Sequence, residues 1–283
     1  MRKNVVWVCV LILILASCAS TSSGESGGRA GAAAATNASR TDQIPVATME
    51  KVLFADGSLD EFVTSEYDDS LSLVQNQNRY SASGALLEQV EYSYQEGSDR
   101  LTTKITRDTE NRLKSRTVYQ YNDQGGLQKE TLVNKAGKAV SSYEYAYNER
   151  GHRTRRILSS GADIKMAETL YTVDNNGVVS ASETRDATGR RISSIQNQYD
   201  NRNNLIQQTI LDANGQVSAT MNYVWQGTNE ISSEQKGSDG SVQIRVTNEY
   251  GNSGELLKRT IENLQGNSVQ IMEYEYAFKP ARR

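Results

Sequence analysis

Apolar and polar residues alternate along most of this chain, and a period of two is typical of a β-strand with one apolar face. The stretch after Gly215 shows the pattern clearly, since the residues between its apolar positions are mostly polar. Its alternate positions are Val217, Ala219, Met221, Tyr223 and Trp225. The sequence therefore predicts strands that have one apolar, tyrosine-rich face and one polar, solvated face.

The strand pattern restarts at a fixed spacing. Glycine, asparagine or aspartate recurs every 25 to 27 residues at positions that we call the turn slots: Gly57, Gly84, Asn111, Gly137, Asp163, Gly189, Gly215, Gly240 and Gly266. Ten residues after each slot stands an aromatic residue, except once, where Val173 takes its place. These aromatic residues, which we call the ladder, are Tyr67, Tyr94, Tyr121, Tyr147, Tyr199, Trp225, Tyr250 and Tyr276. A constant offset within a constant period identifies a repeat protein.

Residues at the turn slots tolerate positive φ at low cost, as tight hairpin turns require. A second turn follows each ladder position, for example Asn122-Asp123-Gln124-Gly125, and a returning strand comes after it. We therefore predict an all-β fold of antiparallel hairpins, with about nine units of ~26 residues and roughly 17 strands, forming a long curved or coiled meander sheet. Open sheets and closed coils use the same hairpins, so the pattern does not choose between them.

The first residues do not fit the repeat. Arg2 and Lys3 precede an apolar run over residues 5–15, which ends at Leu15-Ala16-Ser17-Cys18. This order looks like a bacterial lipobox, with Cys18 as the acylated residue; an ordinary signal peptide or an uncleaved anchor are the alternatives. We predict a signal peptide over 1–18, a flexible tether over 19–47, the repeat domain over 48–278 and a basic tail over 279–283.

Several units open with a similar motif. One unit reads Tyr199-Asp200-Asn201-Arg202-Asn203-Asn204-Leu205, followed by Asp212-Ala213-Asn214-Gly215, and its start recurs as Tyr67-Asp68, Tyr121-Asn122 and Tyr147-Asn148. This motif resembles a YD repeat, the family that includes the shells of bacterial Rhs-type proteins. It covers roughly residues 50–278 and implies a ribbon of β-hairpins with stacked tyrosines that often coils around a space. The period near 26 is longer than expected for that family. The spacing also resembles spirochaetal outer-surface lipoproteins built on a freestanding sheet.

No set of residues points to catalysis or to a cofactor. His152 is the only histidine and opens the basic run His152-Arg153-Thr154-Arg155-Arg156, which we interpret as a solvated turn followed by the outer face of one strand. Asp174-Asn175-Asn176-Gly177 is explained by turn chemistry, without the bidentate glutamate of a calcium loop. Both cysteines lie in the leader and the net charge is −3, so we expect no metal site and no nucleic-acid binding.

The function that fits best is a non-enzymatic, lipid-anchored scaffold for display or binding in the cell envelope, most simply at the outer membrane on its surface or periplasmic side. The membrane would be its partner through the acylated N-terminus, and a protein or a polysaccharide its ligand. The runner-up is a periplasmic carrier of an apolar ligand in a curved sheet. A transmembrane barrel is a third reading, which requires a lipid-facing apolar band. The tyrosine columns could serve as a carbohydrate or peptide platform or simply stabilise the sheet, and any bend would be sought near Val173.

Overall fold

The computed structural model describes residues 43–280, which form one all-β unit. Within these residues, eighteen strands of seven to thirteen residues follow one another in chain order. The strands are β1 (Gln43–Leu53), β2 (Leu59–Tyr67), β3 (Val74–Ser81), β4 (Leu86–Tyr94), β5 (Leu101–Arg107), β6 (Leu113–Tyr121), β7 (Leu127–Asn134), β8 (Ala139–Tyr147), β9 (Arg153–Ser160), β10 (Lys165–Val173), β11 (Val179–Asp186), β12 (Arg191–Tyr199), β13 (Leu205–Leu211), β14 (Val217–Gln226), β15 (Asn229–Gly237), β16 (Val242–Tyr250), β17 (Leu256–Asn263) and β18 (Ser268–Pro280).

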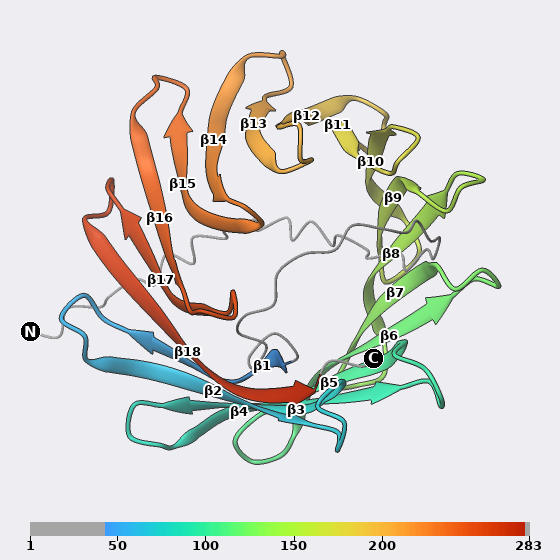
Figure 1. Cartoon of the computed structure of the whole chain (residues 1–283). Coiled ribbons are helices and arrows are strands. Elements are labelled where there is room, and N and C mark those ends of the chain that lie inside the picture. The colour runs from blue at the N-terminus through green and yellow to red at the C-terminus, as the bar shows by residue number, and fades with distance from the viewer. Residues whose placement is uncertain (1–42, 281–283) are drawn as a thin grey trace, which may run out of the picture. The chain divides into compact units, whose positions relative to one another are not determined.

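Consecutive strands pair antiparallel, which confirms the predicted hairpin repeat. The predicted long meander is corrected in one respect, because the sheet closes into a barrel. β1 pairs with β2 on one side and with β18 on the other, from Gln43 opposite Pro280 to Leu53 opposite Ile271. The strands therefore form a ring (Figure 1). A sheet of this size twists and curls, and closure pairs the two edges that an open meander would expose.

Most of the hairpins share one turn geometry. In the turn at Gly215, the amide of Gly215 donates to the carbonyl of Asp212 over 3.1 Å, and the amide of Asp212 donates to the carbonyl of Gln216 over 2.9 Å. Gly215 has φ of +84°, and glycine adopts this conformation without the strain that a side chain would cause there. All turn slots except Gly266 have positive φ; in the last turn the positive φ falls on Asn267, at +49°.

The side chain at the start of many turns adds further bonds. The carboxylate of Asp186, for example, accepts from the amides of Thr188 and Arg190 at 2.9 and 3.0 Å. Aspartate and asparagine favour this position because they hydrogen-bond the backbone two and four residues on. The end of the barrel with the turn slots is called the slot end below, and the end with the ladder residues is called the ladder end.

The barrel is too wide for its side chains to fill. With about 4.8 Å between strands and a tilt of about 40°, eighteen strands give a backbone radius on the order of 18 Å. Among the described residues, no large side chain is fully buried. The most buried apolar residues lie partly in the closing strand β1, at Val46, Val52 and Leu53. The fold is thus a wall around a lumen.

The limits of the barrel differ slightly from the predicted domain boundaries. β1 begins at Gln43, ahead of residue 48, and β18 runs through Lys279 to Pro280. The ammonium of Lys279 donates to the carbonyl of Leu71 over 2.8 Å, so this part of the predicted tail is tied to the β2–β3 turn. The predicted signal peptide, Cys18 and most of the predicted tether lie outside the described residues.

Candidate functional site

The ladder residues lie on the inner face of the barrel. On β12, Ile195, Asn197 and Tyr199 are half-buried, whereas Gln196 and Gln198 between them are exposed. The even-numbered strands repeat this contrast toward the ladder end. In a closed sheet, side chains on the concave face converge and lose contact with water, while those on the convex face spread apart. The tyrosine-rich face is therefore the wall of the lumen.

Each ladder residue bonds to the backbone of the neighbouring strand. The tyrosine hydroxyls, and the indole Nε1 of Trp225, donate to the carbonyl 20 residues earlier over 2.6 to 3.0 Å. Tyr94 reaches Val74 in this way, and Tyr121 reaches Leu101. In most units the acceptor carbonyl belongs to the first residue of the preceding strand, so the offset of 20 follows from the constant repeat. The ladder thus ties the wall together near one mouth of the lumen.

A second column of tyrosines lies deeper along the wall. Burial raises the pKa of Tyr119, Tyr223 and Tyr274 to about 12 each. Burial, together with a 2.7 Å hydrogen bond to the carboxylate of Glu130, also raises the pKa of Tyr145. These phenols stay neutral at physiological pH and offer a flat apolar face with a polar tip.

Cationic side chains lie over several of these rings. The guanidinium of Arg153 lies 4.2 Å from the ring centroid of Tyr145, and that of Arg156 lies 5.1 Å from Tyr143. The ammonium of Lys104 lies 5.8 Å from the ring of Tyr92. A cation within about 6 Å of an aromatic face is attracted by the ring quadrupole. The inner wall from β4 to β9 is therefore both aromatic and basic.

The basic run at His152 was assigned to one outer face, and the structure corrects this. Arg155 does point outward, but Arg153 and Arg156 are both inside. They are three residues apart, so simple alternation would put them on opposite faces. The register between β8 and β9 shifts between Ala146 and Tyr147, and such an extra residue changes the alternation. Sequence reasoning missed this pair, because the bulge leaves no sharp signal in the sequence.

The ladder is broken at Val173, yet the sheet is not. β10 pairs continuously with β9 and with β11, so the expected bend near this unit is not found. Val173 has no hydroxyl for the carbonyl of Arg153, the acceptor 20 residues earlier. In the described part of the chain, three buried side-chain polar atoms have no partner, and two of them are Nδ1 of His152 and Nε of Arg153. The unsatisfied groups thus gather at the missing ladder residue.

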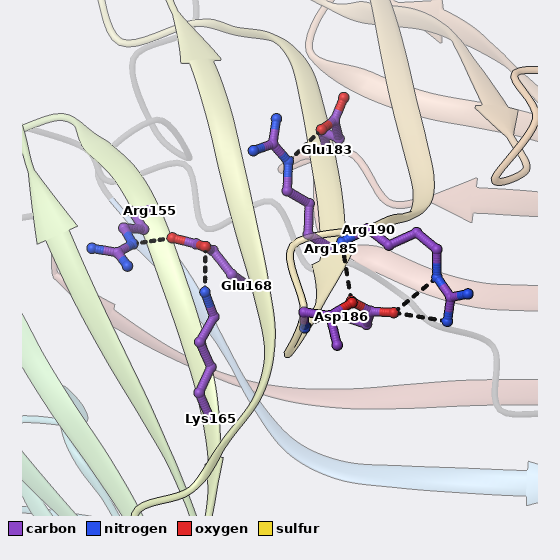
Figure 2. A network of polar contacts seen from close by, with 8 residues as sticks. Arg155, Lys165, Glu168, Glu183, Arg185, Asp186 and Arg190 are labelled. Atoms are coloured by element: carbon purple, nitrogen blue, oxygen red, sulfur yellow. Dashed lines mark hydrogen bonds and ion pairs between the residues drawn. The ribbon is translucent and has the colours of Figure 1, made fainter.

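The outer face carries paired charges. Figure 2 shows Arg155 and Lys165 on the two oxygens of Glu168, and Arg185 on Glu183. The hydrogen bond from Lys165 and the contact with Arg155 hold the pKa of Glu168 below its usual range. Similar pairs lie around the ring: Lys51–Glu275, Arg107–Glu91, Lys129–Glu144, Arg245–Glu234 and Lys258–Glu249. Exposed apolar side chains, such as Ile192, Val224 and Leu257, also lie on the described strands.

In residues 43–280, no group of three or more His, Cys, Asp or Glu side chains could hold a metal ion. The Asp174 turn is built like the others, with its carboxylate accepting from the amides of Asn176 and Val178. His152 is not a fully solvated turn residue, because its ring lies 3.1 Å from where a Cβ on Gly177 would stand. In the same range, no helix is long and apolar enough to cross a membrane.

Comparison with known proteins gives only distant likenesses. No protein-family model and no curated protein matches the chain. Among solved structures, it is similar to porin-like proteins from Bacteroides uniformis (12% identity, 82% of this chain and 98% of that chain, TM-score 0.43) and Bacteroides vulgatus (12%, 82% and 98%, TM-score 0.35). It is also similar to part of a TcdB2–TccC3 structure (12%, 79% and 16%, TM-score 0.32). TM-scores this low carry no argument about function, and membership of the YD-repeat family stays a prediction.

Proposed function

We propose that this chain is a non-enzymatic, lipid-anchored binding protein of the bacterial cell envelope whose barrel stands in water and holds a ligand against its inner wall. The observation that carries the proposal is the division of side chains between the two faces. Tyrosines, arginines and amides face the lumen, whereas many of the charges outside pair with one another. Side chains that could recognise a ligand are therefore concentrated inside.

The sequence analysis named a carrier of an apolar ligand as its second possibility. We keep the carrier and propose a different ligand. The inner wall combines tyrosine rings with Lys104, Arg153, Arg156, Glu130 and amides such as Asn197. A purely apolar ligand would leave these polar groups without partners at a cost in free energy. We therefore propose a ligand that has apolar faces and polar or charged groups. A display scaffold that binds through its outer face is less well supported, because many of the outer charges already pair with one another.

A transmembrane pore is the main alternative, since eighteen strands would suffice for a channel. Such barrels present an apolar band about 25 Å tall to the lipid. Here Lys129–Glu144 and Arg155–Glu168 occupy outer positions within their strands. Charges on a lipid-facing wall cost about 2–4 kcal/mol each at the bilayer midplane. This favours water outside the wall, with acylation at Cys18 as the proposed membrane attachment at the outer membrane.

Fractionation and conductance measurements distinguish a water-soluble binding barrel from a transmembrane pore. The chain without its leader, residues 19–283, is produced and fractionated without detergent. We expect a monodisperse, β-rich protein in the soluble fraction and no conductance when it is added to planar bilayers. Recovery only in detergent, together with stable conductance steps, would overturn the proposal in favour of a pore.

A second measurement addresses the ligand directly. Native mass spectrometry of the full chain purified from its own envelope should show an added mass, because the lumen wall is built to hold a ligand. An unliganded protein in every preparation, and no binding in a screen of amphipathic small molecules and oligosaccharides, would contradict the carrier reading.

A further inference from the structure

We infer that the gap in the ladder at Val173 is a binding site for an acidic sugar, one that presents a carboxylate next to hydroxyl groups. The inference rests on the proposed function and deepens it, because it names the part of the inner wall and the class of ligand. We call the site the ladder gap and define it by Val173, His152, Arg153 and Tyr145.

The first step is the missing hydrogen-bond donor. In every other unit, the ladder side chain donates to the carbonyl 20 residues earlier. For Val173 that acceptor is the carbonyl of Arg153, and an isopropyl group has nothing to donate. The ladder gap therefore offers a carbonyl acceptor without the side-chain donor that serves it in the other units.

The second step is the pair of unpartnered atoms beside it. Nε of Arg153 and Nδ1 of His152 are buried and have no partner among the described residues. Buried polar groups are usually satisfied, so an unpartnered pair at one place suggests a ligand or ordered water. The ring of His152 packs near Gly177, in the turn that follows Val173, and Arg153 is its neighbour in the chain.

The third step is the charge. Many cations of the outer face pair with carboxylates, as Arg155 does with Glu168, while Arg153 forms no ion pair with a described residue and lies over the ring of Tyr145. A guanidinium binds a carboxylate through two parallel hydrogen bonds, and its fixed planar shape makes the contact specific. An anionic group is the natural partner for Arg153.

Together these groups select a type of ligand. The guanidinium would take a carboxylate, the carbonyl of Arg153 would accept from a hydroxyl, and Nδ1 of His152 would bond a second hydroxyl. Tyrosine rings nearby offer flat faces to the C–H side of a pyranose. A uronic acid carries all of these groups on one ring, whereas inorganic phosphate offers none of the apolar surface.

The experiment is calorimetric titration of the full chain, purified in a mild detergent, with oligogalacturonate. The matched probes are the neutral oligogalactose and inorganic phosphate. We expect saturable binding of oligogalacturonate and at least tenfold weaker binding of both other probes. The neutral sugar lacks the carboxylate, and phosphate lacks the sugar ring. Equal binding of the neutral sugar, binding of phosphate at the same affinity, or no binding of oligogalacturonate would overturn the inference.

Variants then place the site. Val173→Tyr should fill the gap and supply the missing hydroxyl, so it should keep or raise the melting temperature and weaken binding of oligogalacturonate about tenfold or more. Arg153→Gln should weaken binding similarly, and Arg155→Gln, on the outer face of the same strand, should not change it. Unchanged binding in Val173→Tyr would overturn the site. If native mass spectrometry finds another ligand while oligogalacturonate fails, this inference falls and the proposed function stands.

Discussion

At the scale of single residues, a repeated side chain stabilises the wall by satisfying a repeated backbone group. The ladder hydroxyls satisfy carbonyls at the start of the returning strands, where the register shifts and regular pairing is interrupted. Aromatic residues on neighbouring strands also stabilise a sheet through contact between their side chains. The main role of the ladder is thus to stabilise the wall. The single break at Val173 is therefore the position where another role would show.

Replacing Tyr121 by phenylalanine tests this role. The ring stays, but the carbonyl of Leu101 loses its 3.0 Å partner, so we expect the free energy of unfolding to fall by about 1 kcal/mol. Denaturant titration followed by circular dichroism measures the change. Tyr80→Phe is the control, because Tyr80 stacks on Phe62 on the outer face. An equal effect of the two substitutions would show that the ladder hydroxyl has no special role.

The inner wall also predicts a pH dependence. Burial raises the pKa of Glu50, Glu61 raises it further, and Arg259 opposes the shift. The folded state then binds the proton more tightly than the unfolded state, so this group lowers the free energy of unfolding as pH rises from the usual carboxyl pKa through the raised one. Glu50→Gln should therefore be more stable than the wild type at pH ~7 and equal to it near pH ~3.

Thermal unfolding at several pH values measures the Glu50 effect, and Glu66→Gln on the outer face controls for the loss of one charge. A Glu50→Gln variant that is less stable than the wild type at neutral pH would show that the ionised carboxylate is stabilising, contrary to this account.

At the scale of elements, the sequence predicts the hairpins because each unit marks its own turns. A residue that accepts positive φ and an aromatic residue ten positions later are enough to define two strands and their faces. Gly266 shows the limit, since the last turn is longer and its positive φ falls on Asn267. The inward pair Arg153 and Arg156 shows another limit, because a bulge changes the alternation locally and leaves no sharp signal in sequence.

The turn geometry makes a matched prediction for two glycines. Gly189 has φ of +87° and nothing lies within 4 Å of an added Cβ, so Gly189→Ala costs backbone strain alone, about 1 kcal/mol. Gly266 lacks positive φ, and an added Cβ there would lie 3.1 Å from Nδ2 of Asn263, which has to shift by a few tenths of an ångström. Chemical denaturation should therefore show a larger loss for Gly189→Ala than for Gly266→Ala. Equal losses would mean that the two turns do not differ as described.

At the scale of the whole molecule, closure is the property that repeat spacing cannot reveal. Each hairpin specifies its two strands and the pairing to its neighbour, and these local rules are the same in an open sheet and in a barrel. Closure depends on β1 and β18, which are farthest apart in sequence and join through long-range pairs such as Lys51 with Glu275. Closure also turns the tyrosine-rich face into an inner wall, so the candidate site could not be recognised as a lumen from the sequence.

The most direct test of this account is therefore a cross-link across the closing pair of strands. Lys51 and Glu273 lie opposite each other on the outer face of β1 and β18. With Cys9 and Cys18 replaced by serine, the Lys51→Cys, Glu273→Cys variant is treated at low concentration with a short bis-maleimide and digested for mass spectrometry. The control places the second cysteine at Lys129 on β7.

A closed barrel predicts a high yield of intramolecular link between β1 and β18 and none in the control. In an open meander the two strands would stand about 80 Å apart, at about 4.8 Å for each strand spacing. No intramolecular link, or links only between molecules, would contradict the closed barrel and with it the lumen on which the proposed function depends.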